Sequence, residues 1–427
     1  MHEKILFKHI DNPDQYKIET YIKNGGYQAI DKVLRQLMPD EVIGIIKKSG
    51  LRGRGGAGFP TGLKWGFVPK DSSEPKFLIC NADEGEPGTF KDRWLIERDP
   101  HQIIEGIIIA SYAIGANLAF IYIRGEFASG AEKLAQAIDE ARAKGFLGGN
   151  ILNSNYDLDI KVHRGGGAYI CGEETSLMNS IEGVRALSRL KPPYPATVGL
   201  FNKPTVINNV ETLSNLSHIV LNGSEWYKGF GTEKSPGTKI FSLSGHINRP
   251  GNYELPLGTP LSQLIYEYGG GVKNDKKLKA VIPGGISTPV LEAKDVDVKL
   301  DYESLCERGS LLGSGGVIVM DETTCMVKVA HRASQFFKHE SCGKCSPCRE
   351  GNYWIEAIMN RIENGQGKPE DIDLLLDITD NINGKTVCPL ADGAIIPISS
   401  TIAKFRSEYE YHIANKKCPS NLKEKFN

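Results

Sequence analysis

Four cysteines near the C-terminal end constrain this chain more than any other feature of its sequence. Two residues separate Cys342 from Cys345 and Cys345 from Cys348, and Cys388 follows forty positions later, directly before Pro389. The spacing is typical of a [4Fe–4S] cluster, because a short C-x2-C-x2-C loop can bind three irons while a remote thiolate binds the fourth. Zinc sites usually pair two C-x2-C units, and no second unit exists. A zinc ion and a disulfide pair remain the alternatives, and the spacing predicts a protein that transfers single electrons.

The composition indicates a globular protein of a reducing compartment. The 427 residues are 40% hydrophobic and 24% charged, which suits two to four domains with buried cores. A formal net charge of −1 argues against nucleic acid or an anionic membrane surface as the main partner. The N-terminus has the pattern of neither a signal nor a transit peptide. Five further cysteines are scattered singly rather than spaced as a disulfide framework: Cys80, Cys171, Cys306, Cys325 and Cys418.

Hydrophobic periodicity predicts three kinds of structure along the chain. The first fifty residues are helical in pattern, and strand-like runs (76–80, 118–123, 158–163) then alternate with helix-like ones (102–114, 129–144, 173–180). The alternation indicates an α/β region with a parallel sheet. After a linker at 230–236, strands at 239–243, 278–282 and 317–320 and a helix near 261–268 predict a small α+β module. Four helical stretches (324–338, 349–364, 369–381, 391–411) predict an all-α four-helix bundle with the cluster at its end.

The pattern also contains a long uncharged run and a C-terminal tail. The uncharged run 106–123 nominally meets the length of a membrane span, but Gly115 breaks it, so we expect a buried helix followed by a core strand. The tail after Ile413 is expected to be mobile.

A first glycine-rich loop, residues 53–58, matches G-x-G-x-x-G but lacks the preceding strand and the following helix of a dinucleotide fingerprint; Pro60 and Gly62 are expected to interrupt a helix there. The loop can still present backbone N–H groups to a phosphate, with charge from Arg54 and Lys64. Three nearby aromatic side chains can stack on a flat ring: Phe59, Trp65 and Phe67. A flexible, solvated loop is the alternative.

Two further segments follow predicted strands, which is where α/β proteins bind ligands. Asp83, Glu84 and Glu86 can accept hydrogen bonds from ribose or ribityl hydroxyls, with an acidic surface turn as the alternative. Residues 164–175 lead from a strand through a glycine loop into a helix, a context that suits phosphate or flavin. There Glu173 and Glu174 can instead have a purely structural role at the helix N-terminus.

Two weaker signals complete the set of candidate sites. Asn208, Asn209 and Thr212 offer hydrogen bonds to a polar ring edge, or form an ordinary helix N-cap. The segment from Lys191 through two prolines to Tyr194 is expected to be rigid and extended, either holding these side chains in place or crossing the surface as a stiff loop.

With these residues identified, the chain closely resembles the flavin-bearing, NADH-binding subunit of respiratory complex I (NADH:quinone oxidoreductase), the F-type subunit of the bacterial enzyme. The likeness covers essentially the whole length, and the motifs at 52–60, 81–92, 165–175 and 341–349 occur in the family's order. It implies a Rossmann-like flavin domain, a β-grasp (ubiquitin-like) module and a C-terminal four-helix bundle. The implied boundaries are 1–70 for the helical segment and glycine loop, 71–235, 236–322, 323–412, and 413–427 for the tail.

The resemblance also implies cofactors and site residues. FMN, NADH and one [4Fe–4S] cluster are expected, with Cys342, Cys345, Cys348 and Cys388 as metal ligands. Glu86 and Glu174 are implied at the catalytic site as binding and tuning residues, since hydride transfer requires no obvious side-chain acid or base. The residues implied around the flavin are Gly53, Arg54, Gly56, Lys64, Asn81, Asp83, Glu84, Tyr169, Gly172, Glu173, Glu174, Asn208, Asn209 and Thr212. Those implied along the dinucleotide are Phe59, Lys64, Phe67, Glu86, Glu174, Lys191 and Tyr194, the last of which can be phenylalanine in relatives.

The implied activity is oxidation of NADH by FMN, followed by single-electron transfer to the cluster and on towards quinone through partner subunits. About fifty residues precede the first glycine loop and Cys418 stands alone near the end, so we expect neither the fused thioredoxin-like domain nor the extra ferredoxin cysteines of some relatives. We therefore expect a separate thioredoxin-like [2Fe–2S] subunit and a larger iron–sulfur subunit as partners, with a cytoplasmic location at the inner face of the plasma membrane. The alternatives are a diaphorase subunit of an NAD-linked hydrogenase or formate dehydrogenase, and a flavin-free scaffold that holds only a cluster.

Overall fold

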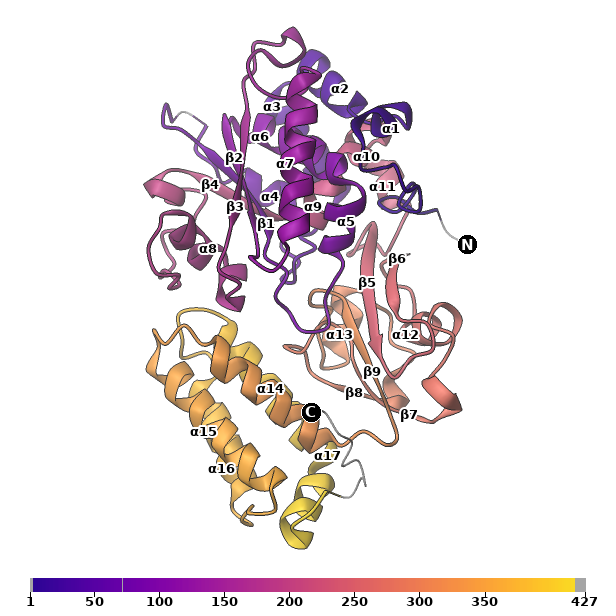
Figure 1. The fold of residues 1–427 in the computed structure, drawn as a ribbon, viewed down its shortest axis with the longest axis vertical. Coiled ribbons are helices and arrows are strands. Elements are labelled where there is room, and N and C mark those ends of the chain that lie inside the picture. The colour runs from indigo at the N-terminus through magenta and orange to yellow at the C-terminus, as the bar shows by residue number, and fades with distance from the viewer. Residues whose placement is uncertain (1–2, 71, 419–427) are drawn as a thin grey trace.

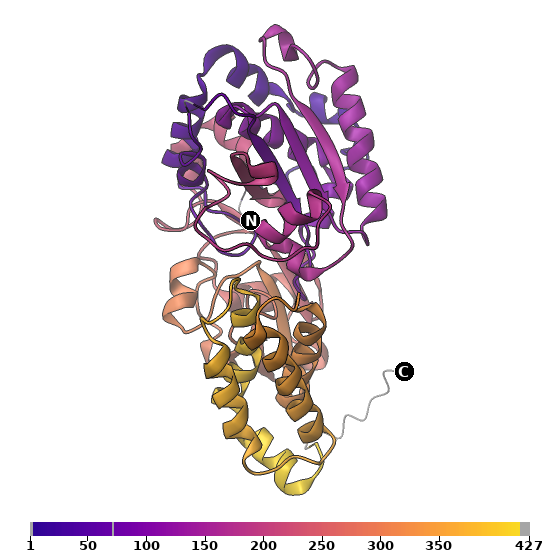
Figure 2. The same cartoon turned by 90° about the vertical axis from the view of Figure 1, so that its left-hand side faces the viewer.

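The computed structural model describes residues 3–70 and 72–418. A part built on a parallel sheet occupies one end of the long axis, and a mixed sheet and four C-terminal helices occupy the other (Figures 1 and 2). The last two parts touch, because Lys404 Nζ donates to the carbonyl of Val290 at 2.6 Å and Lys279 pairs with Glu408.

The N-terminal residues are helical, as predicted. They form α1 (Ile18–Lys23), α2 (Gln28–Gln36) and α3 (Pro39–Ser49), and the glycine loop then leads into α4 (Thr61–Trp65). The expected interruption at Pro60 and Gly62 is wrong. Pro60 stands at the N-cap, before the helix needs its N–H groups, and a side chain at Gly62 would come within 2.5 Å of the Lys47 backbone. Gly62 is therefore what lets α4 pack against α3.

The parallel sheet consists of β1 (Phe77–Ala82), β2 (Leu118–Ile123), β3 (Asp159–Arg164) and β4 (Thr205–Asn209), in the order β3-β2-β1-β4. The chain therefore continues to one side of β1 and later returns to its other side at β4. The predicted parallel sheet is confirmed. The helices of this part are α5 (Asp92–Arg98), α6 (Pro100–Ile114), α7 (Ala128–Ala143), α8 (Glu174–Ile181), α9 (Val210–Ser214), α10 (Leu216–Asn222) and α11 (Ser224–Lys228).

The uncharged run forms a core helix and a strand, as predicted. Helix α6 is buried along nearly its whole length, and Gly115 ends it with φ of 74° before β2 begins at Leu118. Within residues 3–70 and 72–418, no helix is both long and apolar enough to cross a membrane.

The second sheet is mixed and has its own hydrophobic core. Its strands are β5 (Thr238–Gly245), β6 (Gly251–Pro256), β7 (Leu278–Ile282), β8 (Leu291–Glu292) and β9 (Gly316–Asp321), in the order β6-β5-β9-β7-β8. Only β5 and β9 pair in parallel. Helix α12 (Leu261–Gln263) continues as a π turn, η4 (Leu264–Tyr268), and α13 (Tyr302–Glu307) follows β8. Short 3-10 turns are η1 (Ile151–Asn153), η2 (Tyr169–Gly172), η3 (Leu200–Asn202), η5 (Lys273–Asp275) and η6 (Ala293–Asp295).

Four helices end the described chain, close to the predicted bounds: α14 (Met326–Glu340), α15 (Ser346–Glu363), α16 (Asp371–Ile382) and α17 (Leu390–Asn415). Their apolar faces share one core, to which Phe337, Ile355, Leu375 and Ile398 each contribute from a different helix. Helix α17 includes the first residues of the expected mobile tail. Residues 416–418 follow the helix, and the remainder of that tail, 419–427, lies outside the described residues.

Candidate functional site

A cavity of about 550 Å³ lies where the three parts of the chain meet. The first part contributes the glycine loop around Gly56, the segment after β1 and η2. The mixed-sheet part contributes Ser287, Tyr302 and residues 311–314, and α17 contributes its first turns. The cavity thus lies at the carboxyl ends of β1 and β4, between which the chain changes direction across the sheet, as in many α/β ligand sites. Nine predicted site residues line it: Gly56, Asn81, Asp83, Glu84, Glu86, Tyr169, Gly172, Glu173 and Asn209.

The first glycine loop faces this cavity with its backbone. Gly56 has φ of +150°, a conformation that side chains rarely adopt, and a Cβ added there would meet no atom within 4 Å. The adjacent Gly55 and Ala57 also line the cavity. The loop therefore leaves room for a ligand to approach its main chain closely.

The Arg54 side chain points away from the cavity. Its guanidinium is completely buried and donates to the carbonyls of Pro236, Thr238 and Arg52 at 2.9–3.1 Å, and to Tyr227 Oη at 3.0 Å. All three of its nitrogens therefore donate within the protein. The predicted charge contact between this guanidinium and a phosphate is wrong for this geometry, because the side chain instead ties the loop to β5.

Lys91 supplies the positive charge that faces the cavity. Its buried Nζ lies 2.7 Å from Asp92 Oδ1 and 2.8 Å from Glu211 Oε2. Burial disfavours the ammonium, but the two carboxylates outweigh it and raise the pKa of Lys91. Lys91 was not predicted, since a lysine after a Pro-Gly-Thr-Phe turn has the pattern of an ordinary surface residue.

Asp83 presents an unpaired carboxylate to the cavity. Both oxygens are shielded from solvent, and neither has a hydrogen-bond partner within the described structure. Burial raises the pKa of Asp83 to about 7, although Arg124 opposes the shift. A ligand with hydroxyl donors would supply the missing hydrogen bonds.

The neighbouring acidic side chains are held by the protein itself. Glu84 accepts the backbone N–H groups of Asp92 and Arg93 at 2.8 and 3.3 Å, and so caps the start of α5. Glu86 accepts from Tyr169 Oη at 2.7 Å and from the backbone and hydroxyl of Ser287 at 2.8 and 2.7 Å. A carboxylate has about four acceptor positions, so Glu86 retains one for a ligand.

Glu173 has the predicted structural role at the N-terminus of α8 and also lines the cavity, whereas Glu174 is held by two lysines. Glu173 is the N-cap of α8 and accepts from the backbone of Thr175 and Ser176, yet it also lines the cavity. Glu174 lies 2.7 Å from Lys191 Nζ and 3.2 Å from Lys64 Nζ. Burial opposes its ionisation, but these two lysines hold the pKa of Glu174 below its usual value.

Several predicted residues lie outside the cavity wall. Asn208 accepts from the indole N–H of Trp65 at 2.9 Å, which makes Trp65 a core residue and not a stacking surface. Thr212 is buried and accepts from the backbone of Arg54 at 2.8 Å. The others that do not line it are Gly53, Phe59, Lys64, Phe67, Glu174, Lys191 and Tyr194.

The proline segment after Lys191 is not extended as predicted, because its backbone bends at 191–193 and turns at 195–197. The Lys191-Pro192 and Pro192-Pro193 peptide bonds are both cis. Tyr194 is 60% exposed, and Phe59 and Phe67 are 46% and 53% exposed with ring centroids 6.4 Å apart. Phe59 and Phe67 therefore form a pair of rings open to solvent, and the Tyr194 ring is exposed as well.

The four predicted cysteine ligands gather at one end of the C-terminal helices. Cys342 and Cys345 lie between α14 and α15, Cys348 in the first turn of α15, and Cys388 directly before α17. Amide donors point at two sulfurs, with Asn352 Nδ2 3.4 Å from Cys348 Sγ and the Val387 backbone N–H 3.4 Å from Cys345 Sγ. Such donors are common around iron–sulfur clusters.

The spacing of these sulfurs separates the two metal alternatives. A single zinc ion with Zn–S bonds near 2.3 Å would hold its thiolates about 3.8 Å apart. All four cysteines lie within 72–418, and no three of their sulfurs come within 4.8 Å of one another. The set is therefore too open for one zinc ion and fits a larger cluster. Pro389 and Leu390, which follow Cys388, line the cavity, so the cysteine cluster and the cavity share a wall.

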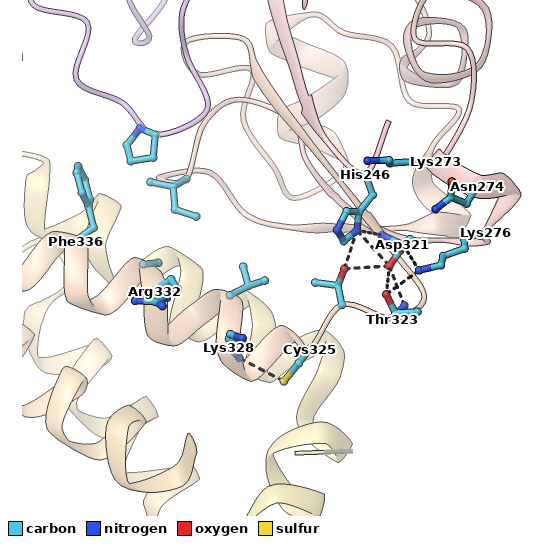
Figure 3. A pocket seen from close by; sticks show the side chains of 15 residues that line it. His246, Lys273, Asn274, Lys276, Asp321, Thr323, Cys325, Lys328, Arg332 and Phe336 are labelled. Atoms are coloured by element: carbon cyan, nitrogen blue, oxygen red, sulfur yellow. Dashed lines mark hydrogen bonds and ion pairs between the residues drawn. The ribbon is translucent and has the colours of Figure 1, made fainter. Parts of the chain in front are cut away.

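A second cavity, of about 640 Å³, lies between the mixed sheet and α14 (Figure 3). His246, Lys276 and Asp321 interact on one side of it, while Lys328 and Arg332 lie on α14. None of the predicted site residues lines it.

Three family models match the chain. They are the Nuo51 FMN-binding domain over residues 46–218, an SLBB domain over 239–319, and the NADH-ubiquinone oxidoreductase-F iron-sulfur binding region over 328–412. The chain is 52% identical over 419 residues to the second F-type subunit of the NADH-quinone oxidoreductase of Rhizobium meliloti (strain 1021), covering 98% of this chain and 100% of that relative. It is 51% identical over 422 residues to the F-type subunit of the NADH-quinone oxidoreductase of Mycobacterium tuberculosis (strain ATCC 25618 / H37Rv), covering 97% and 94%.

The chain also resembles a solved structure of a different enzyme. A crystal structure of NAD+-reducing [NiFe]-hydrogenase in the air-oxidized state matches with a TM-score of 0.83 and 35% sequence identity. The match covers 96% of this chain and 67% of that chain.

Proposed function

Because the chain belongs to the family of F-type subunits of NADH-quinone oxidoreductase, we propose that its central cavity holds FMN and NADH and that the four cysteines at 342, 345, 348 and 388 hold the cluster. The protein is the flavoprotein subunit of an NADH dehydrogenase, with FMN and a [4Fe–4S] cluster as cofactors. FMN supplies the chemistry of accepting a hydride from NADH and releasing electrons singly to an iron–sulfur cluster.

Different residues of the cavity suit different parts of the ligands. The backbone at 55–57 and the Lys91 ammonium suit the phosphate, and the unpaired Asp83 carboxylate suits the ribityl hydroxyls. Glu86, with one acceptor position left, suits a ribose hydroxyl of the nucleotide, while Glu173 lies at the cavity wall near the cysteines. The exposed rings of Phe59, Phe67 and Tyr194 suit the flat parts of the dinucleotide. Arg54 is proposed to act through its position in the loop. The other residues proposed to hold the cofactors, as the family likeness implies, are Gly53, Lys64, Asn81, Glu84, Tyr169, Gly172, Glu174, Lys191, Asn208, Asn209 and Thr212.

The observation that carries this proposal is Asp83. A buried carboxylate without donors is costly, and nearly all buried polar groups in proteins are paired. The cost is explained if a polyhydroxylated ligand completes the site. The open main chain at Gly56, on the other side of the same cavity, provides the space that the ligand's phosphate requires.

We also propose the finer domain assignment. The order β3-β2-β1-β4 supports a Rossmann-like flavin domain at 71–235, after the helical segment and loop at 1–70. In the second sheet the first and last strands form the central parallel pair, which supports a β-grasp module at 236–322. The four packed helices support a four-helix bundle at 323–412, with a tail at 413–427.

As a family member the protein is a subunit of a larger complex. We propose a thioredoxin-like [2Fe–2S] subunit and a larger iron–sulfur subunit as its partners, and a place at the inner face of the plasma membrane, without a membrane span of its own. The alternative, a diaphorase subunit of a hydrogenase, rests on a solved structure that is 35% identical. Relatives above 50% identity favour the F-type subunit of NADH-quinone oxidoreductase instead. Identification of the subunits that co-purify with the chain separates the two.

The test uses flavin binding by the full chain. Gly56→Val should place a side chain in the cavity and weaken FMN binding at least tenfold, about 1.4 kcal/mol, measured by titration of the flavin-free protein. The matched control is Gly145→Val: Gly145 also has a positive φ, +78°, with no atom near its added Cβ, but lies outside the cavity. Wild-type FMN affinity in a folded Gly56→Val protein would contradict the assignment.

A further inference from the structure

Three side chains of metal-binding type converge at the far end of the C-terminal helices. Cys325 caps α14, His412 lies near the end of α17, and Cys418 follows that helix. One ligand atom from each lies within 4.8 Å of the other two, and Cys325 Sγ is 3.6 Å from His412 Nε2. Cys325 and His412 are buried. The proposed NADH site and the four cluster cysteines use none of these residues.

The orientation of His412 is that of a metal ligand. Its Nδ1 lies 2.8 Å from the carbonyl oxygen of Glu408. A carbonyl can only accept, so Nδ1 carries the proton, and the lone pair of a neutral ring is on Nε2. In metal sites a backbone carbonyl fixes the ligating histidine in the same way. Here the lone pair points at Cys325.

A carboxylate lies beside this group. Glu363, the last residue of α15, places Oε2 3.6 Å from His412 Nε2, which is too long for a hydrogen bond. That oxygen is shielded from solvent and has no hydrogen-bond donor within the described structure. Two sulfurs and an imidazole nitrogen thus converge, and a cation among them would also give the buried Glu363 oxygen a partner.

We propose that Cys325, His412 and Cys418 bind a zinc ion, with the neighbouring Glu363 carboxylate moving in as its fourth ligand. Two thiolates, an imidazole and a carboxylate are ligands that zinc takes in tetrahedral geometry. The backbone N–H of Lys328 donates to Cys325 Sγ at 3.4 Å and supports the sulfur from outside (Figure 3). Binding releases the thiol protons to solvent.

The position of this site makes the zinc structural. Helix α14 separates Cys325 from Cys342, and its 15 residues correspond to about 22 Å, so the ion lies at the end of the helices opposite the iron–sulfur cluster. Four protein ligands leave no open position for a substrate. The ion instead joins the start of α14, where the chain arrives from β9, to the end of α15 and to the segment after α17.

Metal analysis of the full chain, purified with its iron and without chelators, tests the proposal. We expect about one zinc per chain beside the iron of the cluster, with a zinc-edge X-ray absorption spectrum that shows sulfur near 2.3 Å and nitrogen or oxygen near 2.0 Å. Cys325→Ser and Cys418→Ser should each lose most of the zinc and keep the iron. Cys418→Ser is the decisive variant, because Cys418 lies outside every helix. Cys306→Ser is the control, since Cys306 is exposed and outside the group.

Four results would overturn the site. They are wild-type protein without zinc, zinc content unchanged in Cys418→Ser, zinc loss from Cys306→Ser as well, and a disulfide between Cys325 and Cys418 found by mass spectrometry of the alkylated protein. Equal loss of iron and zinc from Cys418→Ser would also count against it, because the two metals are proposed to bind at opposite ends of the helices.

Discussion

Replacing Asp83 with asparagine tests the cavity most sharply, because this carboxylate destabilises the flavin-free protein. Burial raises its pKa from 3.8 to about 7, and Arg124 offsets the shift only in part. At 1.36 kcal/mol per pKa unit, the ionisation of Asp83 in the native state lowers the free energy of unfolding by about 4 kcal/mol. This value is an upper limit, because water that enters the cavity solvates the carboxylate and reduces the loss.

The sign of the pH dependence follows from the two pKa values. Between about pH 4 and pH 7, native Asp83 keeps its proton while the unfolded chain has lost it. The native state therefore binds more protons, and its stability falls as the pH rises through this window. The stabilising contribution of the protonated form is fully present below pH 3.8 and lost above about pH 7. Asparagine cannot ionise, so Asp83→Asn lacks this loss.

The assay is thermal unfolding of the flavin-free chain between pH 5 and pH 8, with and without added FMN. Asp83→Asn should unfold at a higher temperature than wild type at pH 8, and this advantage should shrink towards pH 5. FMN should reverse the order, because the wild-type carboxylate then gains hydroxyl donors that asparagine matches less well. Asp139→Asn is the control, since the Asp139 side chain is 76% exposed. A pH-independent difference, or equal FMN affinity in both proteins, would refute the reasoning.

Three further substitutions separate the roles of neighbouring residues. Cys348→Ala should abolish the cluster's electron paramagnetic resonance signal while NADH oxidation by an artificial acceptor of flavin electrons survives; loss of both with FMN bound would contradict separate sites. Glu86→Gln should raise the NADPH to NADH ratio of kcat/KM, because it removes the repulsion between the Glu86 carboxylate and the 2′-phosphate of NADPH. Two like charges 4 Å apart at a dielectric near 20 repel by about 4 kcal/mol. An unchanged ratio would show that another residue sets the nucleotide specificity. Arg54→Ala should lower the free energy of unfolding by about 3–5 kcal/mol in a chemical denaturation series, because it leaves the buried acceptors of four hydrogen bonds without their donor. An unchanged stability would show that these hydrogen bonds contribute little.

The fold could be predicted largely because its main elements have local signals. Long periodic stretches gave α6, α7 and the four C-terminal helices within a few residues, and Gly115 marked the end of α6. The missed strands are β4, β6 and β8, which are short or start in turns. β6 begins at Gly251 within an Arg-Pro-Gly-Asn segment that has turn composition, and β8 has only two residues, Leu291 and Glu292. Such strands are specified by their neighbours in the sheet and not by their own residues.

The site was predictable where a motif follows a strand. Asn81 lies at the carboxyl end of β1, Asp83 and Glu86 follow it, and this end of a parallel strand indicates a ligand position in advance. The residues that other parts of the chain contribute to the cavity wall have no such signal in the sequence. Ser287 contacts Glu86 across 201 positions of sequence, and Leu390 reaches the cavity only because α17 starts there. The direction of Arg54 was missed for the same reason, since the partners that bury it lie between 227 and 238.

The buried charges behind the cavity explain how three parts of the chain hold one shape. Glu211 pairs with Lys91, lies 3.5 Å from Lys239 Nζ and accepts the backbone N–H of Ile240, while Lys239 donates to the carbonyl of Arg54. Burial lowers the pKa of Lys239 to about 7 despite Glu211, so this lysine gains its charge most readily when an anion is near. Removing one member leaves the others buried without a partner, which costs more than the pair contributes. The same network therefore joins the glycine loop to the mixed sheet and holds the Lys91 ammonium at the cavity wall, where the proposed phosphate would meet it.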